Sequence, residues 1–295
     1  MPAERRRVAL VVNPAAGGGR ARRLLPAVEQ ALRGAGHDLL VSGTRSLEHV
    51  DELVGAALAD DRVVAAMGGD GVVGRAAGAV SAGGGLLAVL PGGRGNDFAR
   101  AVGIDRDPVA ACALLSGGVE RAIDLGDVDG TAFLGIASIG FDSAVQERAL
   151  VTRLPLGRAV YLSAALVTVA GWRHARFSGA VDGAPFALHG WSVAVANSGV
   201  YGGGMRLAPD ASVEDGRLDV VTTSATSRAR FLRALPRVFR GTHVREASVA
   251  VRPARVVALA ADRPFRVFAD GDPVGALPCT VSVRPGALRV LLPAG

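Results

Sequence analysis

The first 122 residues alternate short apolar runs with helical stretches, and three of the runs end in glycine-rich turns. Strands are expected at residues 8–12, 39–42, 63–67 and 86–90, with helices at 20–33 and 47–59. Strand, loop, helix, strand is the order of a parallel sheet with helices on both faces. The runs are almost wholly apolar, as strands covered on both sides require. The sequence therefore predicts an α/β domain over residues 1–122.

The pattern changes after about residue 122, where strand-like runs follow one another with turns between them. These runs are residues 132–138, 186–196, 218–223, 247–251, 255–259, 265–269, 280–283 and 287–291. Consecutive strands with glycine and proline turns favour an antiparallel sandwich or barrel, expected over residues 123–285. Helices are expected at 159–172 and 227–240, and residues 286–295 are candidates for packing back onto the first domain.

Charge and composition limit the partners of the chain. A formal net charge of +6 favours anionic partners, but aromatic residues make up only 4% and no RNA-binding aromatic motif is present, so no nucleic-acid partner is predicted. All 33 basic residues are arginine, which excludes a Schiff-base or P-loop lysine. Cys112 and Cys279 form no metal-ligand pattern and are interpreted as free thiols. Without a signal-peptide pattern or an apolar run of about 20 residues, a cytoplasmic protein is expected.

The three glycine-rich turns are candidates for a phosphate-binding site. They are residues 13–19 (NPAAGGG), 68–71 (GGDG) and 91–97 (PGGRGND). At the carboxyl edge of a parallel sheet, such turns direct backbone N–H groups and helix N-termini into one crevice, where missing side chains let phosphate approach. One such turn is ordinary between elements. Three that converge on one edge predict a phosphate site.

The second turn also satisfies the dinucleotide pattern G-x-G-x-x-G through Gly69, Gly71 and Gly74. That pattern belongs to the first strand of its unit, with an acid about 20 residues later. Here it follows the third strand, and no acid lies between Asp70 and Asp97, so a dinucleotide-binding dehydrogenase is disfavoured. A carboxylate at Asp70 repels phosphate unless a cation lies between them, and Mg²⁺ is the usual one. The alternative is a turn residue that binds its own backbone.

Residues 68–71 and 91–100 resemble the paired signatures of the diacylglycerol kinase catalytic domain family, which includes bacterial lipid kinases and the sphingosine and ceramide kinases. The turn at 13–19 is similar to the family's first nucleotide loop, and further matches extend to residues 270–272. The resemblance implies a nucleotide domain, a C-terminal β-sandwich, and ATP with Mg²⁺ in the cleft between them. The nucleotide-binding residues that it implies are Asn13, Pro14, Gly17, Gly18, Gly68, Gly69, Asp70, Gly71, Gly92, Arg94 and Asn96.

The resemblance implies three roles for acidic residues. Asp70, Asp97 and Asp124 are candidates to hold the catalytic Mg²⁺, partly through water. Asp215 is a candidate for a second, structural Mg²⁺, although its sequence also reads as a hairpin turn. Asp270, with Asp272 beside it, is the candidate base that accepts the proton of the lipid hydroxyl. Without the resemblance, Asp-Gly-Asp-Pro between two strand-like runs indicates a hairpin.

Three residues depart from the family pattern. Val72 and Arg94 stand where the family usually has threonine, and Asp272 stands where it has glutamate. Loss of the two hydroxyls weakens nucleotide binding, or Arg94 takes over the phosphate contact. A family member without activity is therefore an open alternative.

The sequence thus predicts an ATP- and Mg²⁺-dependent lipid kinase that converts diacylglycerol to phosphatidic acid. The alternatives are a kinase for a long-chain base or for NAD, and a non-catalytic nucleotide or lipid binder. Residues 227–240 form an amphipathic helix that either packs on the sandwich or rests its arginines on anionic lipid. Peripheral contact with the inner face of the membrane is therefore an expectation, and the choice between monomer and homodimer stays open.

Overall fold

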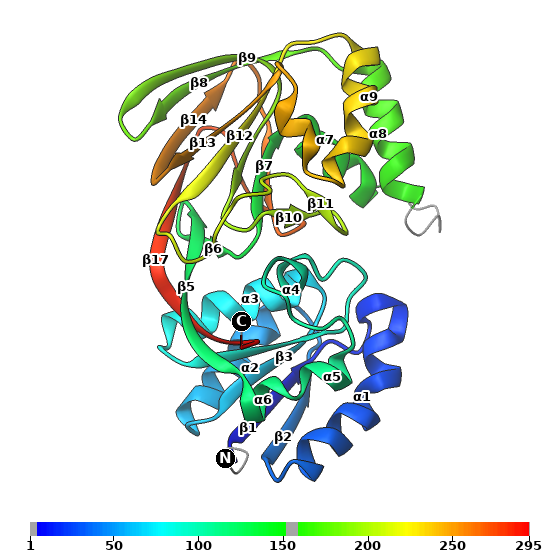
Figure 1. Ribbon diagram of the computed structural model, residues 1–295, viewed down its shortest axis with the longest axis vertical. Coiled ribbons are helices and arrows are strands. Elements are labelled where there is room, and N and C mark those ends of the chain that lie inside the picture. Colours follow the sequence, from blue (N-terminus) through cyan, green and yellow to red (C-terminus); the bar gives the residue numbers. More distant parts are fainter. Residues whose placement is uncertain (1–4, 152–158, 295) are drawn as a thin grey trace.

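The computed structural model describes residues 5–151 and 159–294. Together these residues form two domains, one below the other in Figure 1. The lower sheet contains β1 (Arg7–Val12), β2 (Asp38–Gly43), β3 (Val63–Gly68) and β4 (Leu86–Pro91). These strands are parallel and lie in the order β2-β1-β3-β4. Nearly every residue of β1, β3 and β4 is buried, because helices cover both faces of the sheet. The predicted α/β architecture is confirmed.

The helices of the lower domain follow the strands. They are α1 (Ala16–Gly34), α2 (Glu48–Ala59), α3 (Asp70–Ala82), α4 (Asp97–Ala101), α5 (Pro108–Ala111) and α6 (Leu114–Gly117). The first turn of α1 is irregular, because Gly17, Gly18 and Gly19 have φ angles of 64°, 70° and 84°. Such values favour glycine. Regular helix therefore starts at Arg20, where the sequence predicts it.

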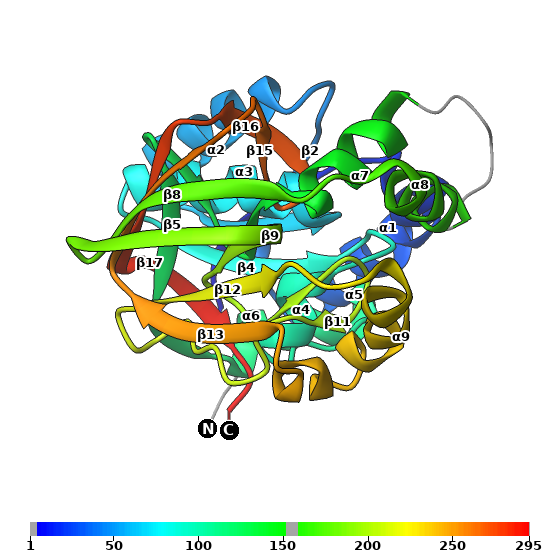
Figure 2. The ribbon, with the colours of Figure 1, turned by 90° about the horizontal axis from the view of Figure 1, so that it is seen from above.

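The upper domain is mostly antiparallel. Its strands are β6 (Thr131–Phe133), β7 (Ile136–Gly140), β8 (Ala175–Val181), β9 (Ala184–Ala196), β10 (Val200–Tyr201), β11 (Met205–Arg206), β12 (Leu218–Ser224), β13 (Val249–Ala254), β14 (Val256–Ala261), β15 (Arg266–Ala269) and β16 (Asp272–Ala276). Figure 2, in which the molecule is seen from above, shows β8, β9, β12 and β13 side by side, in agreement with their pairing. The expected strand at 132–138 is two strands, β6 and β7, separated by residues 134–135.

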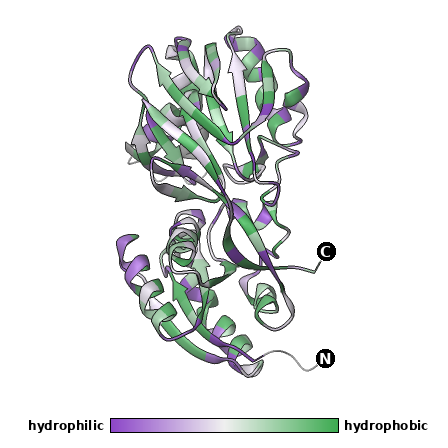
Figure 3. Cartoon of the chain, turned by 90° about the vertical axis from the view of Figure 1, so that its left-hand side faces the viewer, coloured by the Kyte–Doolittle hydropathy of each residue, from purple (hydrophilic) through white to green (hydrophobic). Residues whose placement is uncertain are grey.

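Two long strands connect the domains. β5 (Val119–Val128) pairs antiparallel with β17 (Cys279–Leu292), and both pass through the waist seen in Figures 1 and 3. The sequence predicts two strands at 280–283 and 287–291, but β17 is one strand whose register with β5 shifts between Arg284 and Leu288. Its last part pairs in parallel with β4, at Arg289–Leu86 and Val290–Leu87. The lower sheet is therefore completed by residues from the end of the chain.

Three helices cover one side of the upper domain: α7 (Phe141–Val151), α8 (Ala159–Gly171) and α9 (Arg228–Val238). They share a small core in which Phe141, Val169 and Phe231 pack around the buried Trp191. The Trp191 and Phe231 rings stack with their centroids 3.9 Å apart. Within residues 5–151 and 159–294, no helix is both long and apolar enough to cross a bilayer.

Candidate active site

The three glycine-rich turns meet at the carboxyl edge of the lower sheet. The Asn13 N–H donates to the Met67 carbonyl at 2.9 Å, which connects the first turn to the end of β3. The Gly92 N–H donates to the Gly68 carbonyl at 2.8 Å, which connects the third turn to the second. The structure thus brings all three predicted turns together.

The turns approach so closely that side chains would not fit between them. A Cβ at Gly17 would lie 2.7 Å from the Gly92 oxygen, and a Cβ at Gly93 would lie 2.5 Å from the Gly69 Cα. A Cβ at Gly18 would lie 2.9 Å from a guanidinium nitrogen of Arg94. The glycines therefore allow the three backbones and the Arg94 side chain to form one cradle, which we call the glycine cradle.

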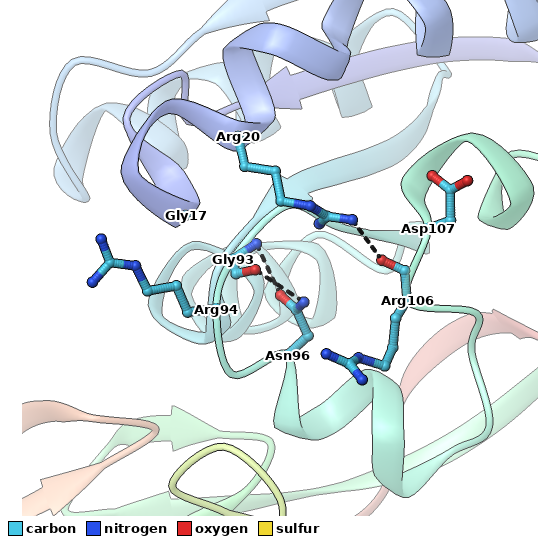
Figure 4. Close-up of a pocket in the computed structure, with 7 residues that line it drawn as sticks. All are labelled: Gly17, Arg20, Gly93, Arg94, Asn96, Arg106 and Asp107. Carbon is cyan, nitrogen blue, oxygen red and sulfur yellow. Dashed lines mark hydrogen bonds between the residues drawn. The ribbon is translucent and has the colours of Figure 1, made fainter. Parts of the chain in front are cut away.

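A cavity of about 380 Å³ opens beside the glycine cradle (Figure 4). It is lined by Gly17, Arg20, Gly93, Arg94, Asn96, Arg106 and Asp107. Arg20 donates to the carbonyls of Pro91 at 2.9 Å and Arg106 at 3.2 Å, so its guanidinium is held in the wall. Arg94 is exposed and makes no hydrogen bond or ion pair within the described part of the chain. Three arginines against one aspartate make the cavity suited to an anion.

The cavity shows residues that sequence reasoning missed. Arg20 lies immediately after the first glycine turn, and this position is the only signal that points to it. Arg106 follows α4 and carries no motif. Asp107 caps α5, because its carboxylate accepts the Val109 N–H at 3.1 Å.

Two predicted nucleotide residues use their side chains within their own turns. The Asn13 side-chain oxygen accepts the Ala15 N–H at 3.0 Å. Asn96 has a φ of 52° and is buried, and its amide accepts from the Gly93 N–H at 2.9 Å and donates to the Gly93 carbonyl at 3.1 Å. Both side chains therefore fix the shape of the cradle.

Val72, the first departure from the family pattern, is buried and does not line the cavity. Its side chain is buried in the core of the lower domain, and a Cβ at Gly68 would lie 2.9 Å from it. The position occupied by Val72 is therefore not part of the cavity wall.

Asp70 connects the second glycine turn to the third. Its carboxylate accepts the N–H groups of Asn96 at 2.9 Å and Asp97 at 2.6 Å, at the start of α4. Burial raises the pKa of Asp70, although these backbone hydrogen bonds oppose the shift. Asp70 therefore fixes the third glycine-rich turn rather than its own turn, and it lies beside the glycine cradle.

Asp97 connects the two domains. Both of its carboxylate oxygens accept the Gly203 N–H of the upper domain, at 2.9 and 3.0 Å. Burial raises the pKa of Asp97 to about 6, and the negative charge of Asp70 adds to the shift. The Arg100 guanidinium acts in the opposite direction.

The hairpin between β15 and β16 places the side chains of Asp270 and Asp272 against the first turns of α3. The Asp270 carboxylate accepts the N–H groups of Leu134 and Gly135, both at 2.8 Å. Burial raises the pKa of Asp270 to about 7, and the charge of Asp70 contributes to the rise. Burial also raises the pKa of Asp272.

Glycines in α3 make room for these two acids. A Cβ at Gly71 would lie 2.6 Å from an Asp272 oxygen, and a Cβ at Gly74 would lie 2.9 Å from an Asp270 oxygen. The spacing that matches the dinucleotide pattern therefore serves a different purpose. It lets a hairpin of the upper domain lie against the helix that starts at Asp70.

Asp124 is not part of this group. Its buried carboxylate accepts the Gly216 N–H at 2.7 Å and the Gly286 N–H at 2.8 Å, and so fastens the region where β5 and β17 shift register. Among the described residues, no three His, Cys, Asp or Glu side chains lie together as a group that could hold a metal ion by themselves. The Mg²⁺ ligand set of Asp70, Asp97 and Asp124, partly through water, therefore stays a prediction.

Asp215 lies in a turn, where its carboxylate accepts the Arg217 N–H at 3.0 Å. Burial raises the pKa of nearby Asp219, and the charges of Asp215 and Asp210 add to the rise. The structural Mg²⁺ at Asp215 stays a prediction.

Asp142, in the first turn of α7, is a further acidic residue in a buried environment. It accepts hydrogen bonds from the hydroxyls of Ser192 and Tyr201, and burial raises its pKa to about 6. Tyr201 immediately precedes the glycine turn whose Gly203 binds Asp97. Asp142 therefore helps to hold the contact between the domains.

Comparison with known proteins assigns both halves of the chain. Residues 7–128 match the model of the diacylglycerol kinase catalytic domain, and residues 135–292 match the YegS C-terminal NAD kinase beta sandwich-like domain. The chain therefore belongs to the diacylglycerol kinase family, as its motifs predict, and is an enzyme of the lipid kinase class.

Named relatives agree with this assignment. The chain is 36% identical over 214 residues to the diacylglycerol kinase of Mycobacterium tuberculosis, covering 70% of this chain and 69% of the relative. It is 36% identical over 275 residues to a Pseudomonas fluorescens protein named "Probable lipid kinase YegS-like", covering 90% of each. A crystal structure of a diacylglycerol kinase from Bacillus anthracis superposes with a TM-score of 0.74 at 19% identity, covering 97% of each chain. That likeness shows the fold.

Proposed function

We propose that this enzyme transfers the γ-phosphoryl group of ATP to a lipid hydroxyl, with diacylglycerol as the first-choice acceptor and Mg²⁺ as the accompanying ion. The observation that carries the proposal is the meeting of the glycine cradle with the Asp270–Asp272 hairpin at the start of α3. One side offers backbone and arginines to an anion, and the other offers a carboxylate to a hydroxyl.

The residues present fit a nucleotide phosphate. Gly17 and Gly93 leave backbone accessible where a Cβ would collide, and the exposed Arg94 guanidinium lies over Gly18. Arginine binds phosphate oxygens through planar, charged donors. In this proposal Arg94 takes over the contact that the missing threonine hydroxyl would make.

The residues also fit a hard cation. Asp70 and Asp97 supply carboxylate oxygens, the donors that Mg²⁺ prefers. The charge of Asp70 raises the pKa of both Asp97 and Asp270, so these acids repel one another when the site is ionised. A cation held by Asp70 and Asp97 would relieve that repulsion. When bound, Mg²⁺ supplies neutralisation of phosphate charge.

Asp270 has the geometry and basicity of a general base. Two backbone N–H groups fix its carboxylate, and a pKa of about 7 makes it a proton acceptor near neutral pH. In the reaction the hydroxyl oxygen bonds to the γ-phosphorus, the bond to the ADP oxygen breaks, and the hydroxyl proton moves to Asp270. Asp272 adds negative charge beside it.

The test is transfer of labelled phosphate from ATP to diacylglycerol, to a long-chain base, to NAD, or to no acceptor. We expect diacylglycerol to be labelled, and Asp270→Asn to reduce kcat by about 10²–10⁴-fold. The matched control is Asp262→Asn, since Asp262 is exposed and its side chain makes no hydrogen bond or ion pair with the described residues. Labelling of NAD alone, ATP binding without transfer, or full activity of Asp270→Asn would contradict the proposal.

A further inference from the structure

Exposed apolar side chains are concentrated on the three helices of the upper domain. Leu150 of α7, Leu166 and Val167 of α8, and Phe239 just after α9 are each more than half exposed, at 57%, 52%, 53% and 56%. The same helices bury other apolar residues around Trp191. They are therefore apolar on two sides, and only the inner side has a partner among the described residues.

The outer side of α9 is a regular stripe. Leu232, Pro236 and Phe239 are exposed and spaced by four and three residues, so they lie on one helical face. Phe231 and Val238 occupy the buried face instead. The apolar residues of the helix are therefore divided between a buried face and an exposed one.

The arginines of α9 divide in the same way. Arg230 pairs with Glu246 at 3.7 Å, and Arg237 pairs with the same carboxylate. Arg233 of α9 and Arg240 just after it are exposed, and their side chains make no ion pair or hydrogen bond with residues 5–151 or 159–294. Each follows an outer apolar residue, Leu232 or Phe239, by one position. At about 100° per residue, both flank the outer stripe.

The outer side of α8 is similar in character. Leu166, Val167 and Ala170 are exposed, and the exposed Arg173 follows the helix. Neither α8 nor α9 contains an acidic residue. In Figures 1 and 2 both helices lie on the same side of the molecule as α1, whose first residues line the cavity.

We infer that these outer faces of α8 and α9 dock on an anionic lipid surface, with the apolar side chains in the interface and Arg173, Arg233 and Arg240 against the headgroups. The combination of apolar and cationic residues without acids complements such a surface. The inference extends the proposed function, because a diacylglycerol acceptor resides in a bilayer.

Co-sedimentation with vesicles tests the inference without any catalytic readout. We expect binding to phosphatidylcholine vesicles that contain phosphatidylglycerol, weaker binding to phosphatidylcholine alone, and weakening by salt. Arg233→Gln with Arg240→Gln is expected to weaken binding about 25-fold, at about fivefold for each arginine. Leu166→Ser with Phe239→Ser is expected to weaken binding at every salt concentration.

A charge-matched control removes the same two charges elsewhere. Arg176 and Arg217 are exposed, lie outside α8 and α9, and their side chains have no hydrogen-bond or ion-pair partner in the described chain. Arg176→Gln with Arg217→Gln is expected to bind nearly as the unaltered protein does. An equal loss in this control would show that net charge alone drives binding and would overturn the inference.

Two further outcomes would overturn it. The unaltered protein could ignore anionic vesicles, or sedimentation velocity could show a dimer that Leu166→Ser with Phe239→Ser dissociates, which would assign the face to a second copy. Failure of the proposed function is separable from both. In that case the vesicles bind through this face, but no lipid acceptor is labelled, including diacylglycerol dispersed in detergent.

Discussion

The substitution Gly74→Ala would press a methyl group against the carboxylate of Asp270. The new Cβ would lie 2.9 Å from the Asp270 oxygen, whereas ordinary contacts begin at 3.4 Å, so the carboxylate must move by about 0.5 Å (3.4 − 2.9). The same carboxylate is fixed by the N–H groups of Leu134 and Gly135 at 2.8 Å. The displacement therefore weakens those hydrogen bonds and misplaces the proposed base.

The two consequences differ in size. Alanine stabilises a helix interior by about 0.5–1 kcal/mol relative to glycine, and a strained hydrogen bond costs about the same, so the free energy of unfolding should change little. Misplacement by 1 Å costs about 10²-fold in rate, so a shift of half that size should lower kcat about tenfold. KM for ATP should stay constant, because Gly74 does not line the cavity.

Gly78→Ala in the same helix is the matched control. A Cβ there would lie 3.6 Å from Ala132, an ordinary contact. We expect a gain of about 0.5–1 kcal/mol in unfolding free energy and an unchanged kcat. Thermal unfolding and steady-state phosphate transfer measure both quantities. Equal kcat values for the two variants would refute the placement of Asp270 against α3.

Three other predictions follow from the site. The pKa values of Asp97 and Asp270 are raised to about 6 and 7, so the folded protein retains protons that the unfolded chain releases. The unfolding free energy should therefore fall as the pH rises from about 4 to 7. Urea titration should also show that millimolar Mg²⁺ stabilises the protein more at pH 7 than at pH 5. A stabilisation by Mg²⁺ that does not depend on pH would contradict this. Arg94→Ala should raise KM for ATP about tenfold or more at unchanged thermal stability, since this guanidinium makes no hydrogen bond or ion pair with the described residues; an unchanged KM would remove Arg94 from the phosphate site. Tyr201→Phe should cost about 1–3 kcal/mol in urea denaturation, because Asp142 loses a hydrogen-bond donor while it stays buried, and a neutral result would contradict that contact.

The architecture of the lower domain was predictable because local pattern determines it. Strands buried on both faces are apolar throughout, and glycines mark the turns where backbones meet. Gly17 and Gly93 illustrate the limit of this reasoning: their turns are evident in the sequence, but the contacts with Gly92 and Gly69 depend on tertiary packing.

The acids were harder to place, because each is held by distant backbone. Asp124 accepts N–H groups from residues 92 and 162 positions away, so its motif gives no sign of the contacts that its carboxylate makes. Asp70 is held 26 and 27 residues away, within the same predicted edge, and it does lie at the site. The division of the α9 arginines likewise depends on Glu246, which no helical pattern includes.

The pairing of β17 with β4 has a consequence for biosynthesis. The ribosome completes residues 289–290 only after the whole upper domain, yet these residues border the lower sheet at Leu86 and Leu87. Until then one edge of that sheet has unpaired backbone N–H and C=O groups, which can pair with strands of other nascent chains. Expression of residues 1–122 alone should therefore yield an aggregation-prone fragment, and addition of a peptide spanning residues 279–292 should protect it.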